Sequence, residues 1–81
     1  MKFKTYILYS KQLEKYYIGS TSMDISERLR RHNTNHKGYT GQINDWEVVY
    51  FKEFKDKSDS LKLERRIKKR GARRYLEGII E

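Results

Sequence analysis

Two short runs of strand-forming residues stand close together near the start of the chain. Residues 3–10, FKTYILYS, and residues 16–20, YYIGS, are rich in Tyr, Ile, Phe and Leu. The five residues between the runs, KQLEK, are polar and form a short connection. This pattern predicts two antiparallel strands joined as a hairpin. Gly19, near the end of the second run, either relieves crowding there or lets another group approach the backbone.

A short helix is expected to follow the hairpin, over residues 25–33. Ser22 or Asp24 can cap its N-terminus, and Glu27 lies in the first turn, where the helix dipole favours an acidic residue. Residues 33–45, NTNHKGYTGQIND, are rich in turn-forming residues, so we expect a surface loop there.

The rest of the chain predicts one more strand and two helices. Residues 46–54, WEVVYFKEF, show the strongest strand pattern in the sequence. A second helix is expected over residues 58–69 with Ser58 as its cap, Gly71 should end it, and residues 72–80 should form a last short helix. The expected fold is therefore α+β: a small three-stranded antiparallel sheet flanked by helices, in the order β-β-α-β-α-α.

The length and composition limit the kind of site that the chain can build. Residues 1–81 make a single small domain, which buries only about two thirds of its unfolded surface, so a site should lie on an open face. There is no cysteine, hence no disulfide and no thiolate metal site. No apolar run approaches the length of a membrane span, and the charged start lacks the core of a signal peptide. We expect a cytoplasmic protein that does not enter a membrane.

The net charge of +8 is concentrated in the last third of the chain. Residues 55–74 contain ten basic and three acidic side chains, a net of +7. Such one-sided charge is typical of nucleic-acid binding, although a solvated helix face would have the same composition. The residues expected to contact nucleic acid, on the same side as Glu64, are Lys62, Arg65, Arg66, Lys68, Lys69, Arg70, Arg73 and Arg74.

A histidine and an arginine break the apolar pattern of the first helix. Ile25 and Leu29 mark its buried stripe, since successive residues of a helix turn by about 100°. His32 falls inside that stripe and Arg28 at its edge, one turn away. His32 is thus either a satisfied core residue or part of a site. His32 and His36 without a third ligand are a weak signal for zinc.

A glutamate also interrupts the apolar arc of the second helix. Glu64 lies between Leu61 and Ile67 on that arc, and burying a lone carboxylate costs several kcal/mol. Two explanations compete: a structural ion pair with Arg28, or binding of a hard metal ion. The sequence contains neither a G-x-S-x-G elbow nor a P-loop.

Two tyrosine motifs connect these features. A YIG motif stands at residues 17–19. Ten residues separate Tyr17 from Tyr6, which lies in a KTY sequence that takes the place of a GIY motif. With ERLRRHN and LERRIKK further on, the chain resembles the GIY-YIG nuclease domain family, in particular small stand-alone bacterial members related to the Slx-type and UvrC-type domains. The resemblance spans essentially the whole chain and implies a metal-dependent DNA endonuclease that uses Mg²⁺ or Mn²⁺.

The resemblance also implies roles for single residues. The residues that match the catalytic positions of the family are Tyr6, Tyr17, Arg28, His32 and Glu64. Glu64 would hold the divalent ion, Arg28 the attacked phosphate, and the tyrosines would activate or orient the water. His32, with an ordinary pKa near 6.5, is the easier base on energetic grounds, so the choice of base stays open.

The expected partner is DNA, with branched or flapped forms among the candidate substrates in repair or recombination. No separate recognition domain is evident, so we expect structure-selective or low-specificity cleavage, with a second copy or a helper protein as sources of specificity. The alternative is a non-catalytic nucleic-acid-binding module, favoured by the lack of any asparagine after Glu64. A third reading is an RNA-associated protein whose seven tyrosines stack on unpaired bases.

Overall fold

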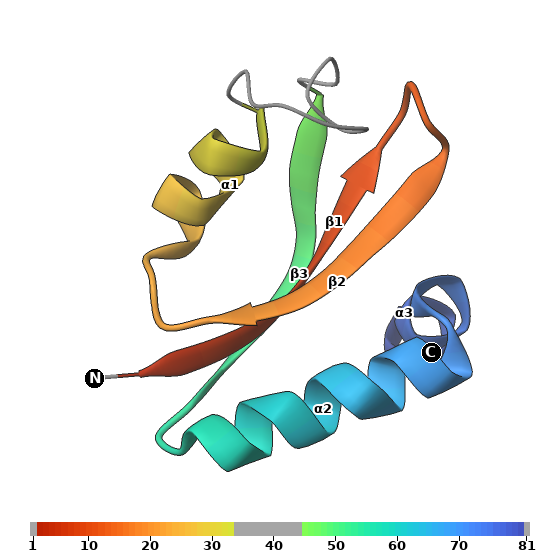
Figure 1. Cartoon of the computed structure of the whole chain (residues 1–81). Helices are drawn as coiled ribbons and strands as arrows, with labels where there is room; N and C mark the ends of the chain where they lie inside the picture. Colours follow the sequence, from red (N-terminus) through yellow and green to blue (C-terminus); the bar gives the residue numbers. More distant parts are fainter. Residues whose placement is uncertain (1, 34–44, 81) are drawn as a thin grey trace.

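The computed structural model describes residues 2–33 and 45–80, and it confirms the predicted α+β order. The elements are β1 (Phe3–Ser10), β2 (Lys15–Thr21), α1 (Ile25–Asn33), β3 (Trp46–Phe54), α2 (Lys57–Arg70) and α3 (Ala72–Ile80) (Figure 1). Most of the loop predicted over residues 33–45, including His36, lies outside the described residues.

The three strands form one antiparallel sheet in the order β2-β1-β3, so the first strand is central. Tyr6 lies opposite Gly19 on one neighbour and opposite Phe51 on the other. The register with β3 shifts between Ile7 and Leu8, where a bulge adds a residue to β3. Residues 4–10 of β1 are thus paired on both sides, which makes it the most buried strand.

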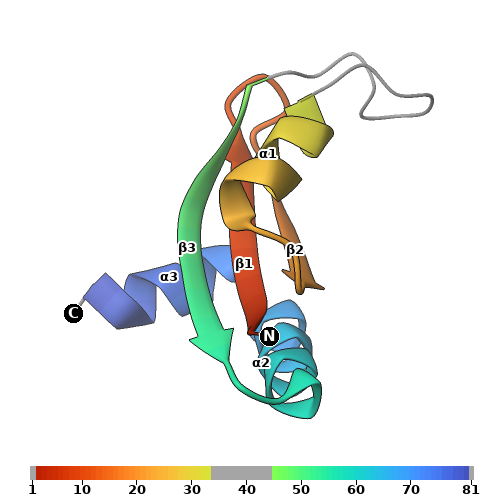
Figure 2. The ribbon, with the colours of Figure 1, turned by 90° about the vertical axis from the view of Figure 1, so that its left-hand side faces the viewer.

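Alternation along β1 sends its side chains into two separate cores. Tyr6 and Leu8 pack with Trp46 on the face covered by α1, whereas Ile7 packs with Ile67 on the face covered by α2 and α3. Figures 1 and 2 show α1 on one side of the sheet and the α2–α3 pair on the other. The sheet is therefore the middle layer of the molecule.

The N-termini of α1 and α2 can be compared with their predicted capping residues. Asp24 directly precedes α1, and its carbonyl accepts a hydrogen bond from the N–H of Arg28 (2.9 Å), so Asp24 rather than Ser22 occupies the cap position. The prediction of Ser58 as the cap of α2 is wrong, because α2 begins at Lys57 and its N-cap is the extended residue Asp56. Contacts with the sheet accompany the earlier start: the carbonyl of Ser60, in the first turn of the helix, accepts hydrogen bonds from the hydroxyls of Thr5 and Ser20.

The end of α1 is tied to the start of β3 by a pair of hydrogen bonds. Asn33 Nδ2 donates to the carbonyl of Trp46 (3.1 Å), and Asn33 Oδ1 accepts from the Trp46 N–H (2.9 Å). This side-chain amide therefore fixes the last turn of α1, and with it His32, against the sheet.

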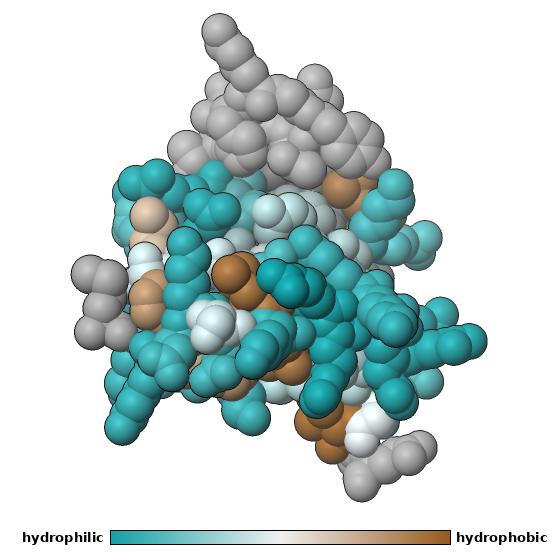
Figure 3. Space-filling model, turned by 60° about the horizontal axis from the view of Figure 1, so that its bottom comes forward, coloured by the Kyte–Doolittle hydropathy of each residue, from teal (hydrophilic) through white to brown (hydrophobic). Residues whose placement is uncertain are grey.

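The outer surface is predominantly polar. Figure 3 shows hydrophilic side chains over most of the face that carries α2, with small hydrophobic areas between them. Within the part of the chain that the structure describes, no helix has both the length and the apolar character required to cross a membrane.

Candidate active site

The site begins with a buried tyrosine on the central strand. Tyr6 is 1% exposed, and its hydroxyl end lies against the backbone of Gly19 on β2. A Cβ at Gly19 would stand 2.7 Å from Tyr6 Oη and 2.8 Å from Tyr6 Cζ, closer than real Cβ atoms approach, and a tight 3.1 Å from Tyr17 Cε1. The Tyr6 ring can therefore occupy this position only because residue 19 has no side chain.

Two side chains from α1 meet the Tyr6 hydroxyl. Arg28 Nε donates a hydrogen bond to Tyr6 Oη (3.1 Å), and His32 Nε2 lies 3.4 Å from the same oxygen. Burial raises the pKa of Tyr6 and the Arg28 guanidinium lowers it, and the balance leaves the pKa above its ordinary value of 10.0. Tyr6 is thus a protonated phenol at neutral pH.

Tyr17, the second tyrosine, is more accessible. It is 38% exposed, and its ring stacks on the Tyr6 ring with centroids 6.3 Å apart. The His32 ring lies 4.6 Å from the Tyr17 ring and 6.3 Å from that of Trp46. His32 is therefore packed among the rings of Tyr6, Tyr17 and Trp46, and its part in a site stays a prediction.

Glu64 reaches the same region from α2. Its side chain is only 18% exposed, and its Oε2 pairs with Lys68 Nζ at 2.7 Å. Burial raises the pKa of Glu64, but the hydrogen bond from Lys68 and the neighbouring Ser20 lower it more, so the net pKa is below the ordinary 4.5. Of the two explanations for this carboxylate, the ion pair with Arg28 is not found: Arg28 donates to Tyr6, and the partner of Glu64 is Lys68.

These residues share one open cleft, which we call the tyrosine cleft. Its volume is about 420 Å³, and Tyr6, Tyr17, Arg28 and Glu64 all line it, whereas His32 is not among the lining residues. The cleft runs along residues 17–22 at the end of β2 and onto α2. Four of the five predicted catalytic residues thus come together, and their roles stay predictions.

The cleft also contains polar residues to which sequence reasoning assigned no catalytic role. Ser20, Lys57 and Lys68 line it together with Glu64. Ser20 Oγ donates to the carbonyl of Ser60 at 3.3 Å, which ties β2 to α2 beside the carboxylate. The spacing of Lys68, one turn after Glu64, was the signal that could have identified it as the partner of Glu64.

The donors in the tyrosine cleft suit a hydrated hard cation. Glu64 is the one carboxylate among the described lining residues, and residues 2–33 and 45–80 contain no cluster of three His, Cys, Asp or Glu side chains. Mg²⁺ keeps several waters and takes one or two carboxylates together with substrate phosphates. An ionised glutamate on an open cleft fits that mode, and it does not fit a cage built from protein ligands alone.

The lowered pKa of Glu64 predicts a contribution to stability that is present at neutral pH and lost at low pH. The folded-state pKa lies below the unfolded value of 4.5, so the ionised carboxylate stabilises the fold fully above pH 4.5, and this contribution is lost as the pH falls through the folded pKa. We expect the difference in unfolding midpoint between the wild type and Glu64→Gln to shrink below pH 4.5. Urea titrations at a series of pH values test this, with Glu53→Gln on the exposed face of β3 as control.

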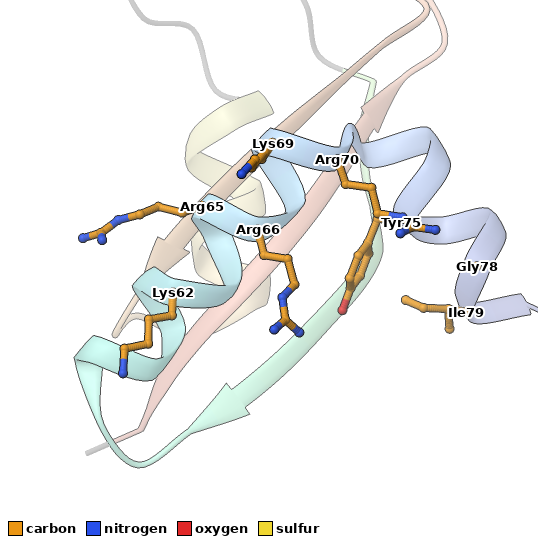
Figure 4. Close-up of a pocket in the computed structure, with 8 residues that line it drawn as sticks. All are labelled: Lys62, Arg65, Arg66, Lys69, Arg70, Tyr75, Gly78 and Ile79. Carbon is orange, nitrogen blue, oxygen red and sulfur yellow. The ribbon is translucent and has the colours of Figure 1, made fainter.

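Six of the eight basic residues predicted to contact nucleic acid divide between two surfaces, whereas Arg73 and Arg74 on α3 line neither of them. Of the eight predicted to contact nucleic acid, the tyrosine cleft includes Lys68 alone. A second concavity between α2 and α3, the basic groove, is lined by the cations Lys62, Arg65, Arg66, Lys69 and Arg70 together with Tyr75 (Figure 4). The expectation that these cations lie on the same side as Glu64 is therefore wrong, because the five groove cations and Glu64 lie on different faces of α2.

Comparisons with known proteins are consistent with this geometry. A solution NMR structure of the UPF0213 protein BH0048 from Bacillus halodurans is similar in fold, with a TM-score of 0.56 and 22% identity over 98% of this chain and 83% of that chain. No curated protein matches the chain. The family model of the GIY-YIG catalytic domain matches residues 2–76. Since that match covers most of the sequence, the chain belongs to the GIY-YIG catalytic domain family, whose members are generally nucleases.

Proposed function

We propose that the protein is a structure-selective or low-specificity DNA endonuclease that hydrolyses phosphodiester bonds with Mg²⁺ or Mn²⁺. The observation that carries the proposal is the tyrosine cleft, where two phenols, a guanidinium and an ionised carboxylate from four elements face one open space. Phosphodiester hydrolysis needs a positioned water, positive charge near the phosphoryl oxygens and help for the leaving oxygen. Each of these needs has a candidate among the four residues.

The cation and the arginine would act on the phosphate. A divalent ion held by Glu64 would supply charge stabilisation to the phosphate and to the departing oxygen. Arg28 is positioned by its hydrogen bond to Tyr6, so its guanidinium is fixed before the substrate arrives. A planar guanidinium binds phosphate in a bidentate manner, and fixing it beforehand lowers the entropy lost on binding.

We assign the orientation of the attacking water to Tyr17, and a supporting role in removing its proton to His32. Tyr6 is buried and its pKa is raised, chiefly by burial, which makes it a poor base and a good positioning residue for Arg28. Tyr17 is the tyrosine with an accessible ring in the cleft, and His32 packs against that ring with its Nε2 3.4 Å from the Tyr6 hydroxyl. In this assignment Tyr17 orients the water, and His32, whose ordinary pKa is near 6.5, helps to remove the proton.

Conservative variants of the two tyrosines should separate these roles. Tyr17→Phe is expected to lower the single-turnover nicking rate about a hundredfold, as the loss of a general acid–base group does. Tyr6→Phe should lower the rate less, about tenfold, because it removes the hydrogen bond that positions Arg28 and not the contact with water. Rates measured between pH 6 and pH 9 should keep the wild-type profile in Tyr6→Phe. An equal loss in both variants would contradict the division of roles.

The proposal as a whole is tested by nicking of supercoiled, flapped and branched DNA. Cleavage is expected with added Mg²⁺ or Mn²⁺ and not with chelator, and a role in DNA repair or recombination in the cytoplasm is part of the same proposal. A preparation purified in parallel from cells lacking the protein controls for contaminating nucleases. Absence of cleavage with every divalent ion and substrate would contradict the proposal.

A non-catalytic nucleic-acid-binding module is the second candidate. It is favoured by the single carboxylate of the tyrosine cleft, which is already paired with Lys68, and by the lack of an asparagine after Glu64. Binding to the same substrates without cleavage would support this module. A preference for RNA over DNA of equal shape would favour an RNA-associated protein instead.

A further inference from the structure

We propose that the basic groove binds a second nucleic-acid segment through its phosphates while the scissile strand lies in the tyrosine cleft. The preferred substrate is then branched nucleic acid, with one arm in each site. This inference rests on the proposed function, because it takes the tyrosine cleft as the place of the scissile strand. The groove is the larger of the two concavities, about 880 Å³ against about 420 Å³.

The two sites lie on different sides of one helix. Successive residues of α2 turn by about 100°, so Glu64 and Lys68 are about 40° apart and both face the tyrosine cleft. Arg66 lies about 160° from each of them, and it faces the basic groove. Side chains occupy a helix diameter of about 10 Å, which separates a phosphate in one site from a phosphate in the other.

The cations of the basic groove repel one another and so destabilise α2. Lys62 and Arg66, Arg66 and Arg70, and Arg65 and Lys69 are like-charge pairs four residues apart, which destabilise a helix. None of the five groove cations forms an ion pair with a carboxylate in the described part of the chain. At the tyrosine cleft, by contrast, Lys68 forms an ion pair with Glu64. A cluster of cations without ion pairs is complementary to a polyanion.

The walls of the groove are held in place by the fold. The hydroxyls of Tyr75 and Tyr50 lie 3.1 Å apart, which links α3 to β3. Arg70 lies against Gly78 of α3, where an added Cβ would be 3.5 Å from a guanidinium nitrogen. In Figure 4 the side chains of Arg66, Arg70 and Tyr75 project into the angle between the two helices. The groove is thus formed before any ligand binds.

The dimensions fit a short length of phosphate backbone. Lys62 and Lys69 are seven residues apart, which is about 10 Å along the helix axis. One DNA strand advances about 3.4 Å per phosphate along its axis, so the groove spans about three phosphates. A linear duplex is too stiff to wrap around α2 and enter both sites, whereas two arms that diverge at a junction can do so.

The test compares binding to a three-way DNA junction with binding to a linear duplex of about ten base pairs, which is about one helical turn. A chelator is present to prevent cleavage. Fluorescence anisotropy gives the ratio of the two affinities for the wild type, for Arg66→Gln with Lys69→Gln, and for a control of equal charge, Lys2→Gln with Lys11→Gln. We expect the wild type to bind the junction about a hundredfold more tightly, since the second contact is intramolecular. The groove variant should lose most of that ratio, and the salt slope for the junction should fall by about 2.

The control variant should keep the wild-type ratio. A ratio that is unchanged in the groove variant, or lost equally in the control, would overturn the proposal. Nicking in Mg²⁺ is measured separately, so a protein that binds junctions through the groove but cleaves nothing would refute the endonuclease while supporting the second site. Conversely, a protein that nicks linear DNA but shows no junction preference would refute the second site alone.

Discussion

A protein carrying Glu64→Gln is expected to nick DNA about a thousandfold more slowly than the wild type, with DNA binding changed less than twofold. Glutamine keeps the size of the side chain and one acceptor oxygen but lacks the charge that holds a divalent ion. Loss of charge stabilisation by the ion amounts to about 4 kcal/mol of barrier, which corresponds to about a thousandfold in rate. Single-turnover nicking at saturating protein measures the effect without interference from binding.

Affinity for Mn²⁺ provides a readout that does not depend on cleavage. The Glu64→Gln protein should bind Mn²⁺ more weakly in titrations followed by electron paramagnetic resonance, whereas Lys68→Met should bind it more tightly, because the Lys68 ammonium now occupies the carboxylate. The matched control is Glu53→Gln, an equal change of charge outside the tyrosine cleft. Wild-type nicking by Glu64→Gln, with contaminating nucleases excluded, would remove this carboxylate from the mechanism.

The elements that sequence patterns predicted well are those whose signals are local. The strand over residues 46–54 and the helix over residues 25–33 have the predicted bounds, because the alternation of side chains and the apolar spacing belong to single segments. Gly71 ends α2 as expected, with a φ of 95° that suits glycine and an N–H bonded to the carbonyl of Ile67 at 2.7 Å.

The features that sequence patterns did not predict depend on contacts between distant segments. The early start of α2 accompanies hydrogen bonds from Thr5 (2.6 Å) and Ser20 (3.3 Å) to the carbonyl of Ser60, and local capping rules contain no such contact. The Glu64 carboxylate was recognised as anomalous, but its partner was not, because packing decides between two nearby cations. The separation of the basic groove from the tyrosine cleft likewise follows from where the sheet meets α2.

Placing a methyl group at Gly19 is expected to damage both the fold and the site. In Gly19→Ala the new Cβ would lie 2.7 Å from Oη and 2.8 Å from Cζ of Tyr6, which is buried and held by Arg28 and His32. The strain of overpacking should lower the free energy of unfolding by about 1–3 kcal/mol. A displaced Tyr6 also moves Arg28, and an error of about 1 Å in the position of a catalytic group lowers the rate about a hundredfold.

The expected losses have separate origins, and a second substitution can distinguish them. Tyr6→Phe in the Gly19→Ala protein removes the closest contact, so the urea midpoint should partly recover. The nicking rate should recover only to the level of Tyr6→Phe alone, about tenfold below the wild type, because Arg28 still lacks its partner. The control for stability is Gly78→Ala on α3, where the added Cβ meets nothing closer than 3.5 Å and alanine favours the helix by about 1 kcal/mol. Wild-type stability and nicking in Gly19→Ala would show that the Tyr6 ring can move freely. Arg28 would then owe its position to some other contact.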